Sequence, residues 1–296
     1  MSHSPSDSAP MSSPMQTLHR VVLFGLLGVF AVFFLLPFYV MLVTSLKDMG
    51  EIRNGSLLAL PQAIDFTAWF KAWGTACTGM SCSGLKPYFV NSLIMIVPAV
   101  VVSTTLGALN GYVLTKWRFK GSELLFSLML FGVFMPLQVV LLPMSQVLGW
   151  IGLSNSIWGL VCVHVLMGLA STTLFFRNYY LGLPDELIKA AMLDGAGFFR
   201  IFWRIVLPLS TPILVVTVIW QFTNIWNDFL FGVVFSGADS KPITVGLNNL
   251  ANTSSSVKEY NVDMAAALIA ALPTLAVYVL AGKYFVRGLT AGAVKG

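Results

Sequence analysis

The feature that most constrains this chain is a series of long apolar stretches separated by short polar segments. A helix needs about 20 apolar residues to cross the hydrocarbon core of a bilayer. Six stretches reach that length, near Val21–Leu46, Phe89–Thr115, Leu124–Val147, Ile157–Phe176, Pro212–Phe235 and Met264–Tyr284. Because lipid offers no hydrogen bonds, each stretch must satisfy its own backbone polar groups as a helix. The sequence therefore predicts an all-α fold, a polytopic membrane protein with six transmembrane helices.

The composition agrees with a membrane location. Hydrophobic residues make up 57% of the chain and charged residues only 10%, whereas about 25% of the residues in soluble domains are charged. The net charge of +5 does not indicate nucleic-acid binding, because the basic residues are scattered in short runs between the apolar stretches. Such a distribution is typical of membrane topology signals.

The positions of Lys and Arg predict the orientation of the chain. If the N-terminus lies inside, the inner segments hold eleven of the 17 basic residues and the outer loops hold six over a greater length. The positive-inside rule then places both termini in the cytoplasm, residues 47–88 in an outer loop and residues 177–210 in an inner loop. Residues 1–19 are rich in Ser, Pro and Met and are predicted to be disordered, with the first span as an uncleaved anchor.

Several residues within the spans indicate how the helices pack. Pro98, Pro136 and Pro273 fall inside predicted spans, where we expect them to kink the helices. Gly107-Ala-Leu-Asn-Gly111 presents small residues four apart, a pattern that allows close helix packing within the subunit or against a partner. We interpret His164 as a hydrogen-bonded packing residue rather than a proton carrier.

Three cysteines are too few for a disulfide scaffold and lack the spacing of metal ligands. Cys77 and Cys82 lie in the predicted outer loop, on the oxidising side of the membrane. They are expected to form either a small disulfide loop or two free thiols. Cys162 lies in the fourth span and is most simply a packing residue.

The most informative polar segment lies between the fourth and fifth spans, and its first part predicts a short helix. Pro184 suits a first helical position, and Asp185 and Glu186 suit the positive end of the helix dipole. Gly195 is expected to end the helix, because glycine adopts the left-handed conformation at little cost. On this helix Leu187, Ala190 and Ala191 are predicted to share one face.

A second short helix is predicted over Phe198–Val206, with Pro208 ending it. The small residues of the segment would let the surface of another protein approach the backbone closely. The alternative interpretation is an amphipathic helix pair that lies on the membrane surface.

The run Lys-Ala-Ala-x-x-Asp-Gly-Ala over residues 189–196, followed by Ile-Val-Leu-Pro208, resembles the Glu-Ala-Ala loop of permeases in binding-protein-dependent ABC importers. The resemblance extends over all six spans and implies the type I importer permease fold. In that family the loop docks on the ATP-binding subunit. The candidate coupling residues are Glu186, Lys189, Ala190, Ala191, Asp194, Gly195, Ala196, Leu207 and Pro208. Lys189 replaces the family's motif Glu, so an ion pair specific to Glu is not assumed.

The last residues also resemble this family, in particular the tail of the smaller permease of maltose importers. That tail reaches between the two ATPase subunits, which implies contacts for Gly288, Gly292 and Gly296. On this interpretation residues 20–286 form the permease domain and residues 287–296 a thin, flexible cytoplasmic tail. The alternative is a frayed terminus without a role.

The resemblance also implies the partners and the location. We expect a second, similar permease, two ATPase subunits and a periplasmic sugar-binding protein in a bacterial inner membrane. The closest similarity is to carbohydrate permeases of the glucose/mannose type. The chain has no Gly-x-x-x-x-Gly-Lys-Ser/Thr loop, no H-E-x-x-H pair and no Cys/His metal cluster. It is therefore predicted to be non-catalytic, with ATP on its partners and no cofactor or metal of its own.

Polar residues in the fifth span are candidates for the lining of the transport pathway, namely Gln221, Asn224, Asn227 and Asp228. A charge or amide at this depth is expected to face a water-filled cavity or another subunit. The alternative is that these residues join helices by hydrogen bonds. An ion-coupled secondary transporter is the rival function, but such carriers usually place several ionisable groups at mid-membrane.

Overall fold

The computed structural model describes residues 14–79, 81–253 and 258–293, and no β-strand occurs among them. Four long helices are α1 (Pro14–Ser45), α4 (Lys86–Lys116), α7 (Ile157–Leu181) and α14 (Tyr260–Ala293). The shorter helices are α2 (Met49–Asn54), α3 (Thr67–Gly74), α5 (Ser122–Val133), α6 (Leu137–Trp150), α8 (Asp185–Leu193), α9 (Phe198–Ile201), α10 (Leu207–Leu209), α11 (Thr211–Trp226), α12 (Leu230–Phe235) and α13 (Ile243–Asn252). A π-helix over Phe202–Val206 connects α9 to α10.

Four of the described helices are long and apolar enough to cross a membrane, and six spans result if each of two bent pairs counts as one. The predicted third span, Leu124–Val147, is divided into α5 and α6, which meet at an angle of 105°, so the kink expected at Pro136 is a break between two helices. Pro136 lies at this break. It has no N–H to donate, and it disfavours helical geometry in the residue before it.

The fifth predicted span, Pro212–Phe235, is also interrupted. Helix α11 ends at Trp226 after 16 residues, and the chain turns before α12 begins at Leu230. At its other end α11 meets the segment Phe198–Leu209 at 81°. The polar residues between Trp226 and Leu230 favour this turn, because their side chains compete with the helical backbone for hydrogen bonds.

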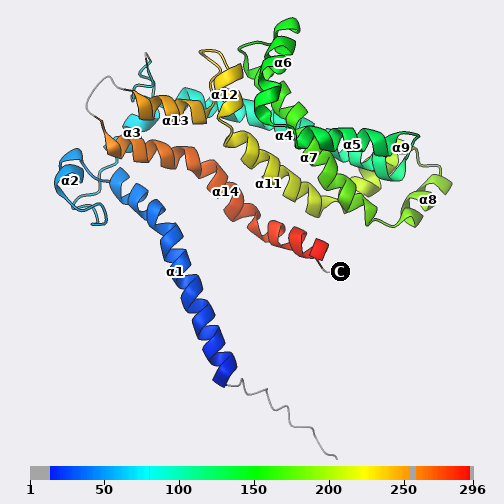
Figure 1. Cartoon of the computed structure of the whole chain (residues 1–296), viewed down its shortest axis with the longest axis horizontal. Helices are drawn as coiled ribbons and strands as arrows, with labels where there is room; N and C mark the ends of the chain where they lie inside the picture. The colour runs from blue at the N-terminus through cyan, green and yellow to red at the C-terminus, as the bar shows by residue number, and fades with distance from the viewer. Residues whose placement is uncertain (1–13, 80, 254–257, 294–296) are drawn as a thin grey trace, which may run out of the picture.

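Helix α1 extends away from the other helices, and the C-terminal end of α1 contacts α14 (Figure 1). None of the residues in its most apolar window is buried. Because α1 begins at Pro14, the part of the predicted disordered segment from residue 14 to residue 19 is helical. Residues 1–13 lie outside the described part of the chain.

Helices α4 and α7 make the most extensive contact of any two helices among the described residues. A Cβ atom on Gly107 would overlap the side chain of Thr172, and one on Gly111 would lie 2.8 Å from the backbone nitrogen of Arg177. The predicted close packing at this glycine pair is therefore confirmed, and it occurs within the subunit. Because the interface has no space for one extra carbon, a displacement of α4 is transmitted to α7.

The bundle has two apolar cores, one toward each end. One core joins α3, α4, α7, α11, α12, α13 and α14, and Trp226 is its largest fully buried side chain. The other contains Tyr112, Phe176, Tyr180 and Phe202, beneath α8 and α9. Figure 1 shows α3 and α13 at one end, here called the disulfide end, and α8 and α9 at the opposite coupling-loop end.

Helix α14 continues as far as Ala293. The predicted thin tail over residues 287–296 is therefore helical through most of its length, and Gly288 and Gly292 lie four residues apart within the helix. Ala, Val and Leu are abundant here and continue the helical ladder in spite of the two glycines. Gly296 lies outside the described residues.

Candidate functional site

Helix α8 is the predicted first helix of the loop, with Pro184 just before it rather than at its first position. Its end at Gly195 is confirmed, since this residue has a φ of +79°. The N–H of Ala196 donates to the carbonyl of Ala191 at 2.9 Å, and that of Gly195 donates to Met192 at 3.0 Å. This paired hydrogen bonding is the Schellman arrangement, which satisfies the last carbonyls and turns the chain sharply.

The second helix does not end at Pro208, which corrects the prediction. The helical segment passes from α9 through the π-helix into α10, which ends at Leu209 with Ser210 as its C-cap. The N–H of Leu207 donates to the carbonyl of Phe202, five residues earlier. This wider turn accommodates a proline that lacks an N–H and whose ring would clash with the carbonyl four residues before it. The bend into α11 follows at once.

Most of the predicted coupling residues lie on the surface. Glu186, Lys189, Ala190, Asp194, Gly195 and Pro208 are exposed, whereas Ala196 and Leu207 are half-buried. Ala191 is buried with Ile188, three residues earlier, against the core around Tyr112 and Phe202. Leu187 is the neighbour of Ala191 on α8, four residues away, but it is exposed, so the predicted face is buried on one side only. Ala191 holds α8 on the bundle, and Leu187 faces outward.

Sequence reasoning missed the large apolar residues of this surface. Leu193 is 90% exposed, and Phe199 and Trp203 are also exposed. The four-residue spacing of Phe199 and Trp203 was the available signal, because it places both rings on one helical face. These exposed apolar residues, Leu187, Leu193, Phe199 and Trp203, are together called the apolar docking face below, after the role proposed for them.

Lys116, at the end of α4, connects α8 to the bundle. Its Nζ lies 2.6 Å from the carbonyl oxygen of Leu183 and 2.6 Å from Oδ1 of Asp185. The hydrogen bond from Lys116 and then its charge hold the pKa of Asp185 below its usual value. From the sequence, Lys116 contributed only to the prediction of orientation. The residues around Lys116 do not indicate that the fold brings Asp185 next to it.

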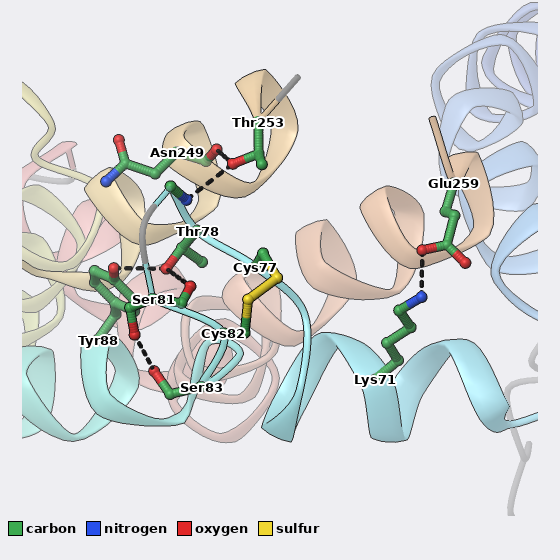
Figure 2. Close-up of a disulfide and its surroundings, with 11 residues drawn as sticks. Lys71, Cys77, Thr78, Ser81, Cys82, Ser83, Tyr88, Asn249, Thr253 and Glu259 are labelled. Atoms are coloured by element: carbon green, nitrogen blue, oxygen red, sulfur yellow. Dashed lines mark hydrogen bonds and ion pairs between the residues drawn. A yellow bond between two sulfur atoms is a disulfide. The ribbon is translucent and has the colours of Figure 1, made fainter. Parts of the chain in front are cut away.

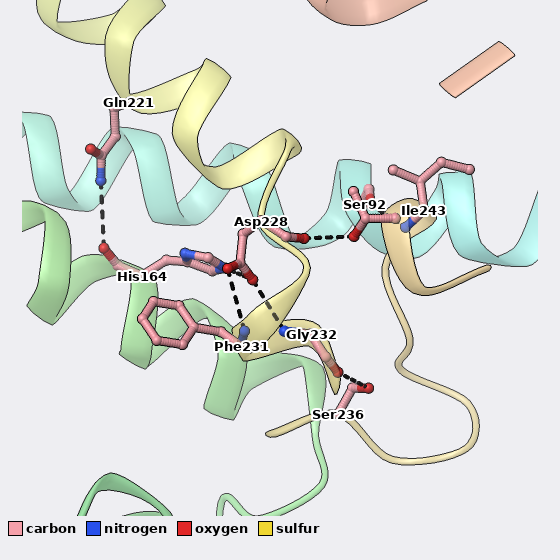
Figure 3. Close-up of polar contacts among 9 residues, drawn as sticks. Ser92, His164, Gln221, Asp228, Phe231, Gly232, Ser236 and Ile243 are labelled. Carbon is pink, nitrogen blue, oxygen red and sulfur yellow. Dashed lines mark hydrogen bonds and ion pairs between the residues drawn. The ribbon is translucent and has the colours of Figure 1, made fainter. Parts of the chain in front are cut away.

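The candidate pathway residues do not form one face. Gln221 is buried, and its Nε2 donates to the carbonyl of His164 at 3.5 Å. Asn224 and Asn227 are exposed and donate to backbone carbonyls of their own helix, at 2.8 and 3.0 Å. Asp228 accepts from the backbone N–H groups of Phe231 and Gly232 and so caps α12 (Figure 3).

His164, on α7, packs against the turn after α11 and the start of α12. Its Nε2 lies 3.8 Å from Oδ2 of Asp228, and its ring meets that of Phe231 edge-on (Figure 3). This buried Nε2 has no hydrogen-bond partner within the described part of the chain. The packing role of His164 is confirmed, and the predicted hydrogen bond of its side chain is not present at this atom.

At the disulfide end, Cys77 and Cys82 are bonded to each other (Figure 2). The loop between them is attached to neighbouring elements, since Thr78 Oγ1 lies 2.8 Å from the hydroxyl of Tyr88 and the N–H of Gly79 donates to Thr253 at 3.0 Å. Cys162 packs against the apolar core, as predicted. Among the described residues, no group of three or more His, Cys, Asp or Glu side chains could hold a metal ion.

Residues 88–289 match the family described as the binding-protein-dependent transport system inner membrane component. The chain belongs to this family, and it is a membrane permease subunit rather than an enzyme. A probable ABC transporter permease of Pyrococcus horikoshii is 47% identical over 188 residues, 63% of this chain and 68% of the relative. The xylose/arabinose import permease of Haloferax volcanii is 32% identical over 293 residues, 92% of each chain.

A solved structure confirms the fold. A chain in the crystal structure of a bacterial ABC transporter involved in the import of the acidic polysaccharide alginate has a TM-score of 0.80. The two chains are 23% identical, and the match covers 94% of this chain and 100% of that one. The predicted all-α permease fold is therefore confirmed.

Proposed function

We propose that this chain is the permease subunit of an ATP-driven sugar importer and that α8 and α9 dock on an ATPase subunit. The observation that carries the proposal is the helix pair itself. Its inner side is anchored by Ile188, Ala191 and Phe202, and its outer side presents the apolar docking face. Exposed large apolar residues mark a contact with protein or membrane, and we propose a protein contact because the chain here resembles the docking loop of importer permeases.

The family and its members support the wider assembly. The family is described as a membrane component of a binding-protein-dependent system, which supports a periplasmic binding protein as partner. A second permease and two ATPase subunits complete the proposed importer. ATP binding to the ATPases would draw the coupling helices together, and the bundle would open outward to receive the substrate.

The proposed orientation has both termini in the cytoplasm. It rests on the excess of Lys and Arg in the segments at the coupling-loop end. In this orientation the disulfide end is periplasmic, where disulfides persist. The end of α14, with Gly288 and Gly292, would then lie close to the ATPase subunits, and Gly296 would extend this contact.

The proposed substrate is a sugar, since a relative that matches almost the whole chain is named as a xylose/arabinose import permease. A monosaccharide such as glucose or mannose is the specific proposal. The exposed amides of Asn224 and Asn227 are the candidate pathway residues that remain accessible. Gln221 and Asp228 would act behind them, by holding α11 and α12 against α7.

Site-directed crosslinking tests the docking proposal. In membranes that contain the whole transporter, Leu193→Cys is expected to crosslink to a nucleotide-binding subunit. Phe70→Cys is the matched control, because it is also highly exposed, at 77%, but lies in α3 at the disulfide end. Crosslinking of the control alone would overturn the proposed orientation. Sugar uptake by the purified chain under an ion gradient alone would support a secondary transporter instead.

A further inference from the structure

The side chain of Lys116 is buried, although it belongs to the last residue of a helix at the edge of the bundle. It is only 5% exposed, whereas the carboxylate of Asp185 is 63% exposed. A buried ammonium is costly unless hydrogen bonds replace its water. The carbonyl of Leu183 and the carboxylate of Asp185 supply two of these bonds. Both acceptors lie at the start of α8, so Lys116 fixes the entry to the coupling helix.

The attachment has a defined direction. Leu183 precedes α8 and Asp185 is its first residue, whereas Ile188 and Ala191 anchor the rest of the helix through apolar contacts. Apolar contacts resist separation but allow sliding, because the hydrophobic effect is not directional. Hydrogen bonds have a preferred geometry. Lys116 is therefore the contact that opposes movement of α8 along the surface of the bundle.

Helix α4 is well suited to receive this force. It is packed on α7 through Gly107 and Gly111 without space for an added carbon. A second ion pair at the same end joins Arg177 of α7 to Glu123 of α5 at 2.8 Å, and the guanidinium also lies 4.0 Å from the centre of the Phe126 ring. Displacement of α8 would thus move α4, α7 and α5 together.

We infer that Lys116 is a positioning residue that fixes the coupling helix α8 to α4 and so transmits ATPase motion to the rigid pair of α4 and α7. The inference rests on the proposed function, since it assigns a role within the same coupling site. It predicts that loss of the Lys116 bonds uncouples ATP hydrolysis from transport without removing the docking face.

The main experiment uses Lys116→Met in the complete transporter, reconstituted with its binding protein. Methionine keeps the apolar stem and removes the ammonium. We expect the ATPase subunits to co-purify normally and basal ATP hydrolysis to persist, while sugar transported per ATP falls about tenfold, as for the loss of a charged hydrogen bond. Lys120→Met is the matched control, because Lys120 is exposed and lies outside every ion pair identified among the described residues.

Two further variants separate positioning from folding. Lys116→Arg should restore most of the coupling, since arginine can donate to both acceptors and a pocket of about 540 Å³ beside the site leaves room for its guanidinium. Asp185→Asn should have a smaller effect than Lys116→Met, because the bond to Leu183 remains. An equal loss of sugar transported per ATP in Lys116→Met and Lys120→Met would overturn the inference. A normal value of this ratio in Lys116→Met would also overturn it.

The outcome for the wild-type chain distinguishes this inference from the proposed function. If no ATPase co-purifies with the wild-type subunit, the proposed function fails. If the ATPase co-purifies and Lys116→Met remains fully coupled, only the role of Lys116 fails. If Lys116→Met loses its ATPase subunits while Lys116→Arg keeps them, the residue maintains the docking face itself and the force-transmission role is refuted.

Discussion

The backbone N–H of Gly232 donates a hydrogen bond to Oδ2 of Asp228, 3.1 Å away. Asp228 thereby caps the start of α12, at the turn where α11 has ended. His164 of α7 lies beside the same carboxylate, 3.8 Å away, so Asp228 caps the turn where it packs against α7.

We expect Asp228→Asn to keep one of the two capping bonds, because its amide nitrogen cannot accept a hydrogen bond, and Asp228→Ala to lose both. Asparagine caps helices about as well as aspartate, and replacement of such a cap by alanine costs about 0.5–2 kcal/mol. The measurement is the thermal unfolding temperature of the purified permease in detergent. Equal destabilisation by both substitutions would show that the charge of Asp228 matters and not its capping bonds.

Gly195→Asp is expected to abolish transport while the subunit still inserts into the membrane. The left-handed conformation of Gly195 is unfavourable for a residue with a Cβ, and a charge would be buried at the docked surface. Gly197→Asp is the control, because Gly197 is also exposed but has a φ of −82°. Sugar uptake and insertion are measured in the same membranes. Normal uptake by Gly195→Asp would exclude a coupling role for this turn.

Gly107→Ala should destabilise the subunit by about 1–3 kcal/mol, because the added methyl overlaps Thr172 in a filled interface. Gly132→Ala in α5 is the matched control, since no atom beyond its chain neighbours and the backbone of its own helix lies within 4 Å of its Cβ position. Alanine favours helices over glycine, so the control should be neutral or stabilising. Thermal unfolding in detergent measures both. The close packing of α4 on α7 would be contradicted by a neutral Gly107→Ala.

Alkylation of the denatured, unreduced protein should modify one cysteine, Cys162, and leave Cys77 and Cys82 protected by their bond. Mass spectrometry counts the added groups. Replacement of both bonded cysteines by serine should destabilise this end by about 2 kcal/mol, the loop-closure contribution of a short disulfide loop. Modification of all three cysteines without reductant would show that the disulfide does not form.

The contribution of Asp185 to coupled transport should not change between about pH 7 and pH 5. Its pKa is lowered by the hydrogen bond from Lys116, so its stabilising effect is fully present above the unfolded value of 3.8 and is lost only as the pH falls through the lower folded value. The measurement is the ratio of transport by the wild type and Asp185→Asn over this range. A ratio that falls toward one near pH 5 would mean that Asp185 is not held in its ionised form.

Much of the architecture follows from sequence patterns with a local cause. Apolar length predicts the long helices α1, α4, α7 and α14, and glycine at position 195 predicts the end of α8. The spacing of Gly107 and Gly111 predicts close packing. Each of these signals acts within a few residues, so no knowledge of the tertiary fold is required.

The remaining features depend on tertiary contacts. A run of apolar residues does not show whether a proline kinks one helix, as predicted for Pro136, or separates two helices that meet at 105°. The continuation of the helix past Pro208 depends on a π-helix, and no residue type specifies a π-helix. Ala191 and Ala190 are equivalent by composition, and only the position of the core decides that Ala191 is buried.

The break between α5 and α6 has a consequence for the life of the subunit in the cell. It falls in the middle of an apolar stretch, and Phe134 beside it is 81% exposed in the single chain. Irregular backbone at membrane depth is tolerated only where protein or water covers it. In the proposed importer the second permease would cover this break, and an unpaired subunit would expose it to lipid. Cells that synthesise this chain in excess of its partner should degrade the surplus, so quality control would set its abundance.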